Sequence, residues 1–188
     1  MKVYRIRTDA NNFQSFYPID EKIWDTNLLI FDGASRKKDW IPLEVYVLQT
    51  KLKRGNFFKL CPGSLVVDKY AIDSLASFFE MSGELLPIFF DNTEYNILNV
   101  TECVNVLNQE NTNWVNGQST GKKIRIEKYS FLPERFVEVP LFKIPETCKS
   151  EILTITGIKD PDYEFKTKVE KLGLQGLIFE EIWSYSHE

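Results

Sequence analysis

Side chains that could perform nucleophilic or acid–base chemistry are few in this sequence. His187 is its single histidine and lies one residue from the end of the sequence. Histidine is the usual general base, and the usual partner of a nucleophilic serine or cysteine. A catalytic triad would have to take its imidazole from this terminal position. We therefore expect no catalytic residues of this kind.

The three cysteines, Cys61, Cys103 and Cys148, are widely separated and form no C-x-x-C pair. With one histidine beside them, they lack the spacing of zinc ligands. Their odd number also argues against the disulfide framework of a small secreted protein. We therefore expect reduced thiols, no metal site and no cofactor.

Two local patterns look like reactive sites but differ from them in detail. Gly117 to Lys123 resembles a phosphate-binding loop, yet three residues instead of four separate its glycines, and Lys123 stands where Ser or Thr belongs. Glu180 and Glu181 form a visible carboxylate pair. Successive residues of a strand point to opposite faces, so these two cannot flank one scissile bond. The sequence thus predicts a protein that is not an enzyme.

The charge balance restricts the class of partner. The sequence has 188 residues, with 23 basic and 27 acidic side chains and a net charge of −4. Nucleic-acid-binding proteins usually carry a basic excess, so the basic clusters at 36–38, 51–54 and 122–123 are interpreted as solvated loops. No apolar run approaches the ~18 residues of a membrane span, and the N-terminal residues lack a signal-peptide core. We expect a cytoplasmic protein without nucleic-acid or membrane partners.

Two main helices are predicted. The first covers 69–81, because Asp68 can cap it, Gly83 can end it, and an apolar stripe that includes Leu75 and Phe78 follows helical spacing. The second starts at Asp160 and Pro161 and carries a stripe of Phe165, Val169 and Leu172 before Gly173.

Apolar and β-branched runs predict strands between these helices. We expect a short helix after Thr101 that contains Cys103, Val104 and Leu107, and a polar loop over 108–120. Hairpin-like pairs dominate, so the predicted fold class is α+β, with a largely antiparallel sheet, the two main helices and a few short ones. The chain length suits either a single domain over 1–188 or two tightly packed subdomains, 1–55 and 56–188. The predicted strands are 2–7, 40–48, 85–90, 95–100, 122–131, 136–142, 152–158 and 177–183.

The central block carries a family resemblance. It includes Gly63–Tyr70 with Leu75, then Leu86–Phe89, Tyr95–Val100 and Glu102–Asn108, and Gly176–Trp183 closes the pattern. These segments resemble bacterial immunity protein family eleven, formerly domain of unknown function sixteen twenty-nine, whose members are encoded beside polymorphic toxin genes. Asn108 stands where the family pattern has Asp.

The resemblance covers residues 60–110 and 173–183, and its motifs are mostly scaffold and turn residues. It implies a protein that binds a cognate toxin protein in the bacterial cytoplasm and neutralises it, with no catalytic residue of its own. The alternative is a non-enzymatic interaction or structural module with a different partner.

Residue type suggests where a partner could bind. Aromatic anchors carry much of the affinity in many interfaces, and charged groups supply specificity. Trp183 could equally belong to the core, and the two glutamates could be ordinary solvated residues. The predicted partner-binding residues are Asn111, Asn113 and Trp114 in the polar loop, and Glu180, Glu181 and Trp183 in the last strand.

Overall fold

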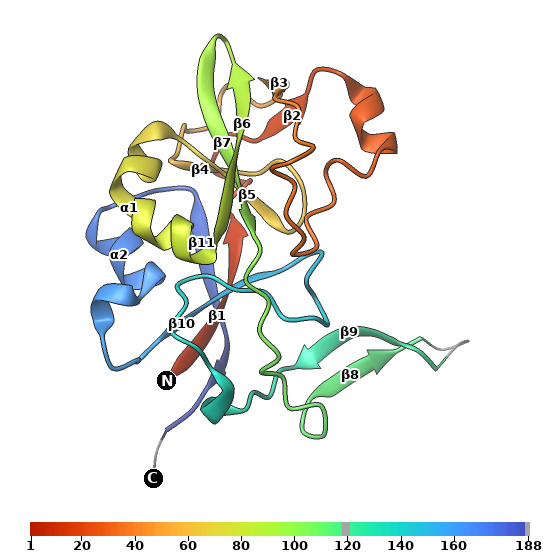
Figure 1. Cartoon of the computed structure of the whole chain (residues 1–188), viewed down its shortest axis with the longest axis vertical. Coiled ribbons are helices and arrows are strands. Elements are labelled where there is room, and N and C mark those ends of the chain that lie inside the picture. The colour runs from red at the N-terminus through yellow and green to blue at the C-terminus, as the bar shows by residue number, and fades with distance from the viewer. Residues whose placement is uncertain (118–120, 187–188) are drawn as a thin grey trace.

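The computed structural model describes residues 1–117 and 121–186, and it confirms the α+β prediction (Figure 1). Its two α-helices are α1 (Lys69–Ser82) and α2 (Phe165–Lys171). Among the described residues, all pairs of named strands are antiparallel except that of β3 with β6. Three short 3₁₀ helices complete the described helical elements: Glu21–Asp25, Pro133–Arg135 and Pro161–Tyr163.

The strands form three sheets of different size. The largest has the order β2 (Phe16–Pro18), β3 (Leu43–Val47), β6 (Gly83–Phe90), β7 (Thr93–Val100), β5 (Ser64–Val67), β4 (Phe57–Phe58). The second has the order β10 (Ile152–Thr156), β1 (Lys2–Thr8), β11 (Leu177–Ser184). The third pairs β8 (Asn113–Asn116) with β9 (Lys123–Lys128).

Helix α1 forms as predicted and covers one face of the six-stranded sheet. The Asp68 carboxylate accepts a hydrogen bond from the Ala71 N–H at 2.8 Å, which caps the first turn. Leu75, Phe78 and Phe79 are buried against the sheet. The other sheet face carries a second apolar cluster under the 19–40 segment, so β5 is buried on both faces.

The predicted hairpin of β6 and β7 is also present. Asp91 and Asn92 both adopt positive φ, at 50° and 57°, as a two-residue turn between twisted strands requires. Gly83 ends α1 and begins β6 at the same residue. A Cβ at Gly83 would lie 2.0 Å from the Asn99 carbonyl oxygen, so glycine is needed here for the close approach of two backbones.

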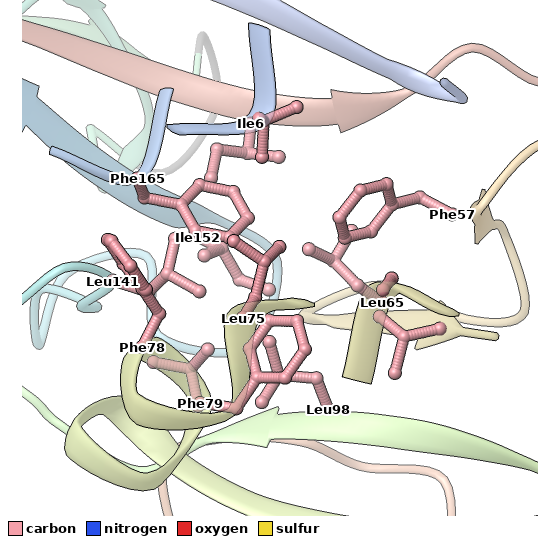
Figure 2. Close-up of a cluster of buried hydrophobic side chains, with 14 of the residues drawn as sticks. Ile6, Phe57, Leu65, Leu75, Phe78, Phe79, Leu98, Leu141, Ile152 and Phe165 are labelled. Atoms are coloured by element: carbon pink, nitrogen blue, oxygen red, sulfur yellow. The ribbon is translucent and has the colours of Figure 1, made fainter. Parts of the chain in front are cut away.

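The three-stranded sheet packs its two faces against different partners. On one face, Ile6 and Ile152 join Phe165 of α2 and the side chains of α1 in a single core (Figure 2). On the other face, Val3 and Leu153 contribute to a third apolar cluster, next to the β8–β9 sheet. The central strand β1 therefore has buried side chains on both faces, Ile6 on one and Val3 on the other, and its partners β10 and β11 come from the last part of the chain.

The second predicted helix is divided in two. Asp160 caps the 3₁₀ helix Pro161–Tyr163, and α2 begins only after Glu164. The Glu164 carboxylate accepts hydrogen bonds from the Gly157 N–H and the Thr167 hydroxyl, both at 2.6 Å. Phe165 and Val169 are buried, as their spacing predicted.

Three local predictions are wrong. The helix expected after Thr101 is absent from this described segment, because Cys103 and Leu107 form isolated β-bridges with Lys143 and Phe131. No strand covers 136–142, where Phe142 alone bridges Leu153. The polar segment 108–120 contains β8, while its residues 118–120 lie outside the described part of the chain.

The remaining strand predictions differ from the structure at their ends. The strand expected over 40–48 begins only at Leu43, just after Pro42, which cannot donate to a sheet. The predicted boundary at residue 55 lies between β3 and β4, and strands from its two sides pair with each other. Within the described residues, no helix has the length and apolar character that crossing a membrane would require.

Candidate functional site

Strands β8 and β9 form a two-stranded arm, which projects from the side of the molecule (Figure 1). At its base, Ile126 is buried in the third apolar cluster with Tyr129 and Phe131. Further out, Ile124 is 67% exposed, although the alternation of β9 placed it on the same face as Ile126. The core ends before Ile124, so the arm presents an apolar side chain to solvent.

Trp114 of β8 belongs to a polar cluster at the inner side of the arm. Lys123 Nζ lies 4.5 Å from the centroid of its ring, a cation–π contact, and 3.4 Å from Gln109 Oε1. Gln109 in turn donates a hydrogen bond from Nε2 to Glu146 Oε1. These contacts connect the arm to the 145–151 segment of the body.

A groove separates the arm from β11. Its first hollow, of about 520 Å³, is lined by residues 124–129 on one side and by Glu180–Ile182 on the other. A second hollow, of about 620 Å³, is lined by Lys128–Ser130, Glu181–Ser184 and Asn111. The two hollows share residues 128–129 and 181–182, so we treat them as one groove.

The floor of the groove is a charged network centred on Arg5 of β1. Its guanidinium donates to Glu151 Oε1 at 2.6 Å and to both Glu180 oxygens, at 2.8 and 3.2 Å. The Tyr129 hydroxyl donates to the second oxygen of Glu151 at 2.6 Å. One cation thus holds carboxylates from two distant parts of the chain, and Tyr129 attaches the base of the arm to them.

The pKa shifts in this network favour its paired state. Burial opposes the charge of Arg5, but its hydrogen bonds to Glu180 and Glu151 outweigh that effect and raise its pKa. The hydrogen bond from Arg5 lowers the pKa of Glu180, and burial, with the hydrogen bond to Glu151, raises the pKa of Tyr129. A general acid or base needs a pKa near neutrality, and these shifts lead away from it. The network therefore suits a structural role better than proton transfer.

Glu180 and Glu181 bind different cations. Glu180 pairs with Arg5 and lies 3.6 Å from Arg7, whereas Glu181 pairs with Lys2 at 2.7 Å. Both line the first hollow, and neither is free to act with the other on one bond. In the described part of the chain, no group of three or more His, Cys, Asp or Glu side chains is placed to hold a metal ion. His187 lies outside the described residues.

Lys143 is a lysine whose amine lies inside the protein. Its side chain is fully buried, and Nζ donates to the Phe31 carbonyl oxygen at 2.6 Å. Burial lowers its pKa to about 8. An amine with this pKa could be reactive, but its complete burial keeps it away from any substrate.

The structure gathers most of the predicted binding residues in one place. Asn111, Glu180, Glu181 and Trp183 line the groove. Asn113 and Trp114 lie on β8, with Asn113 exposed and Trp114 half-buried. Trp183 is also half-buried and packs on Phe131, so its ring belongs partly to the third core cluster.

Sequence reasoning missed the residues that join the two sides of the groove: Arg5, Tyr129, Glu146 and Glu151. One signal was available, because Arg5 and Arg7 recur with period two in the predicted strand 2–7 and mark a charged face. Nothing local indicated that Glu151 would meet them. A search against models of known protein families gave no match, and a search of curated proteins gave none either. The resemblance to the immunity family therefore stays a prediction from sequence.

Proposed function

We propose that this protein binds a cognate toxin protein in the bacterial cytoplasm and neutralises it, using the arm and the groove beside it. The observation that carries the proposal is the gathering of four of the six predicted partner-binding residues in this groove. The toxin as partner comes from the sequence resemblance. The groove geometry supports the choice of this surface.

The surface has the composition of a protein interface. Ile124 offers an exposed apolar side chain. The half-buried Trp183 lines the second hollow, and the half-buried Trp114 lies opposite Ile126 in the arm. Charged side chains surround them, which suits a surface that selects one partner and associates rapidly. The carboxylates of the groove floor are already paired, which favours recognition over turnover.

Co-expression tests the proposal. The protein is produced together with the toxin encoded next to its gene, and growth and co-purification are scored. We expect the native protein to restore growth and to co-purify with the toxin. If neither happens, the immunity proposal is wrong.

A matched pair of variants tests the location of the surface. Ile124→Asp places a charge on the arm, while Tyr70→Asp makes the same change on α1, where Tyr70 is 57% exposed. We expect Ile124→Asp to lose co-purification and Tyr70→Asp to keep it, with both variants folded by circular dichroism. The opposite pattern would place the interface on the helical side.

The alternative is an interaction module whose partner is not a toxin. It shares the same surface and differs in the consequence of binding. Growth protection separates the two, because an unrelated partner would bind at the groove while the toxin continued to kill the cell.

A further inference from the structure

Several distant segments of the chain meet at the Phe31 carbonyl oxygen. This oxygen accepts the hydrogen bond of the buried Lys143 amine at 2.6 Å. A Cβ added to Gly63 would lie 2.7 Å from the same oxygen and 2.7 Å from the Lys149 carbonyl oxygen, so these backbones are in close contact. Each cysteine lies close to this point along its own segment: Cys61 two residues before Gly63, Cys148 next to Lys149, and Cys103 bridged to Lys143.

A backbone bridge and a turn bring Cys103 and Cys148 toward each other. Cys103 forms a parallel β-bridge with Lys143. The chain turns directly after Lys143, because the Thr147 N–H donates to the Ile144 carbonyl oxygen at 3.1 Å. Cys148 follows this turn and is therefore carried back toward the bridge.

The charges of these two thiols act on each other. Burial raises the pKa of Cys103, and the charge of Cys148 is the largest electrostatic effect that adds to it. Burial lowers the pKa of Lys143 to about 8, and the charge of Cys148 opposes this effect most. Cys61 is buried, and its thiol shares a hydrogen bond of 3.2 Å with Ser64 Oγ. Cys103 and Cys148 are therefore the pair in electrostatic contact, with the Lys143 amine beside them.

We propose that Cys103 and Cys148 form a reversible disulfide when they meet a small-molecule disulfide, such as oxidised glutathione. Cys103 is exposed and Cys148 half-buried, so a small oxidant can reach the pair. The Cys103 thiolate attacks one sulfur of the oxidant and releases one thiol. The Cys148 thiolate then attacks the Cys103 sulfur and releases the second thiol. The protein gives up two electrons and two protons, and the oxidant becomes two thiols.

The surroundings of the pair suit this reaction. The thiolate is the reactive form of cysteine, and a neighbouring amine cation favours it. The disulfide is neutral, so its formation removes the repulsion between two thiolates. The bond would also restrain the 145–151 segment, whose Glu146 and Thr147 line the first hollow. Thiol oxidation needs no partner protein, so this inference does not depend on the proposed function.

Oxidation of the folded full chain with glutathione disulfide tests the proposal. Mass spectrometry of the intact protein and of its peptides identifies the product. We expect the loss of two hydrogen atoms in mass, a Cys103–Cys148 bond and a free thiol at Cys61, and reduced glutathione should restore all three thiols. Glutathione that stays attached to both cysteines, a bond that includes Cys61, or the absence of any reaction would overturn the proposal.

Unfolded protein provides the matched comparison. Nearly the same number of residues separates Cys103 from Cys61 and from Cys148, so loop closure in an unfolded chain favours neither pairing. In denaturant the two disulfides should form in similar amounts. In the folded protein the Cys103–Cys148 bond should exceed the other by at least about tenfold, because the fold raises the effective concentration of one thiol at the other. Similar amounts of both in the folded protein would contradict the proposal.

Serine variants identify the two sulfurs and the effect of the bond. Cys61→Ser should still form it, while Cys103→Ser and Cys148→Ser should not, with all three variants folded by circular dichroism. Oxidation of the native protein should slow amide hydrogen exchange over 144–151, because this segment gains a covalent link to Cys103. Cys148→Ser under the same oxidant should show no change. Unchanged exchange in the oxidised native protein would refute the restraint on this wall of the groove.

Discussion

The two sides of the central strand β1 are stabilised in different ways. On the helical side, Ile6 packs with Leu75, Phe79 and Phe165 in a core of apolar side chains (Figure 2). On the groove side, Arg5 of the same strand is held by Glu151 and Glu180. Apolar packing is non-directional and depends on the area buried, whereas the charged network depends on the position of individual atoms.

This difference shows where stability and recognition are located. The helical side supplies the burial that any chain of this size needs to fold. The groove side keeps polar groups and strand edges at the surface, where another protein can reach them. Variants on the two sides should therefore separate effects on unfolding from effects on binding.

The largest effect on stability is expected on the helical side. Leu75 is fully buried, so Leu75→Ala should lower the free energy of unfolding by about 2–5 kcal/mol through the cavity it leaves. Chemical denaturation measures this change. Tyr70→Ala, at an exposed position of the same helix, should change it little. Equal effects at the two positions would contradict the assignment of the buried helix face.

The next prediction concerns pH and the buried amine of Lys143. Its folded pKa of about 8 lies below the ordinary value of 10.5. Below pH 8 the Lys143 amine is charged in the folded protein although it is buried. Above pH 10.5 this amine is neutral in both the folded and the unfolded protein. The unfolded state binds more protons between these values, so this group adds stability as the pH rises, up to roughly 3 kcal/mol.

Denaturation of native protein and Lys143→Met across pH 7–10 tests this expectation. In Lys143→Met, the free energy of unfolding should lack the increase with pH that Lys143 contributes. Lys159→Met, at an exposed position, should retain this increase. Cys61, whose pKa burial raises to about 11, acts in the opposite direction in this range. The informative quantity is therefore the difference between native protein and variant. A pH-independent difference would show that Lys143 titrates normally.

A smaller effect is expected for the Arg5 network. Arg5→Met removes the hydrogen bonds to Glu151 and Glu180 and should cost about 1–3 kcal/mol at neutral pH. Arg7→Met is the matched change. Arg7 is mostly exposed and its guanidinium lies 3.6 Å from Glu180, a longer contact, so this variant should cost less.

The hydrogen bond from Arg5 lowers the pKa of Glu180. The contribution of Glu180 to stability is therefore present above the ordinary glutamate pKa of about 4.3 and is lost in acid. A difference between Arg5→Met and native protein that stayed constant down to pH 3 would contradict this account.

The smallest effect on stability is expected at the tip of the arm. Ile124→Ala should change the free energy of unfolding by less than about 0.5 kcal/mol, because the side chain is mostly exposed. Ile126→Ala, two residues along, should cost roughly 2 kcal/mol or more because it empties a core position. Thermal unfolding of the two variants decides the matter. If they are equally destabilised, both residues are core residues.

The helical side could be predicted from sequence because its signals are local. Asp68 and the stripe around Leu75 lie within one short segment, as does the turn at Asp91 and Asn92. The capping residue, the apolar periodicity and the turn residues all indicate the same elements. Secondary structure can be predicted from sequence where local signals agree in this way. The bounds of α1 followed from these signals, whereas the second predicted helix is interrupted at Glu164 and α2 covers only Phe165–Lys171.

The groove side could not be predicted to the same extent because its partners are far apart in the chain. Cys103 pairs with Lys143, and Arg5 meets Glu180. Neither contact leaves a mark on local periodicity, so a helix was expected near Cys103. Strand β8 is short and contains two asparagines, which are uncommon in strands. Individual residues such as Trp114 were recognisable, but the surface they form was not.

The pairing of β1 with strands near the other end of the chain has a consequence for synthesis. The partners of Arg5 in β11 and β10 follow it by 175 and about 150 residues. A ribosome adds about 5–20 residues per second, so β1 emerges roughly ten seconds or more before its last neighbour exists. During that time β1 has neither of its partner strands. The last strand of the six-stranded sheet ends at residue 100, so this sheet can form before β10 and β11 are synthesised. It then provides a surface against which β1 can pack.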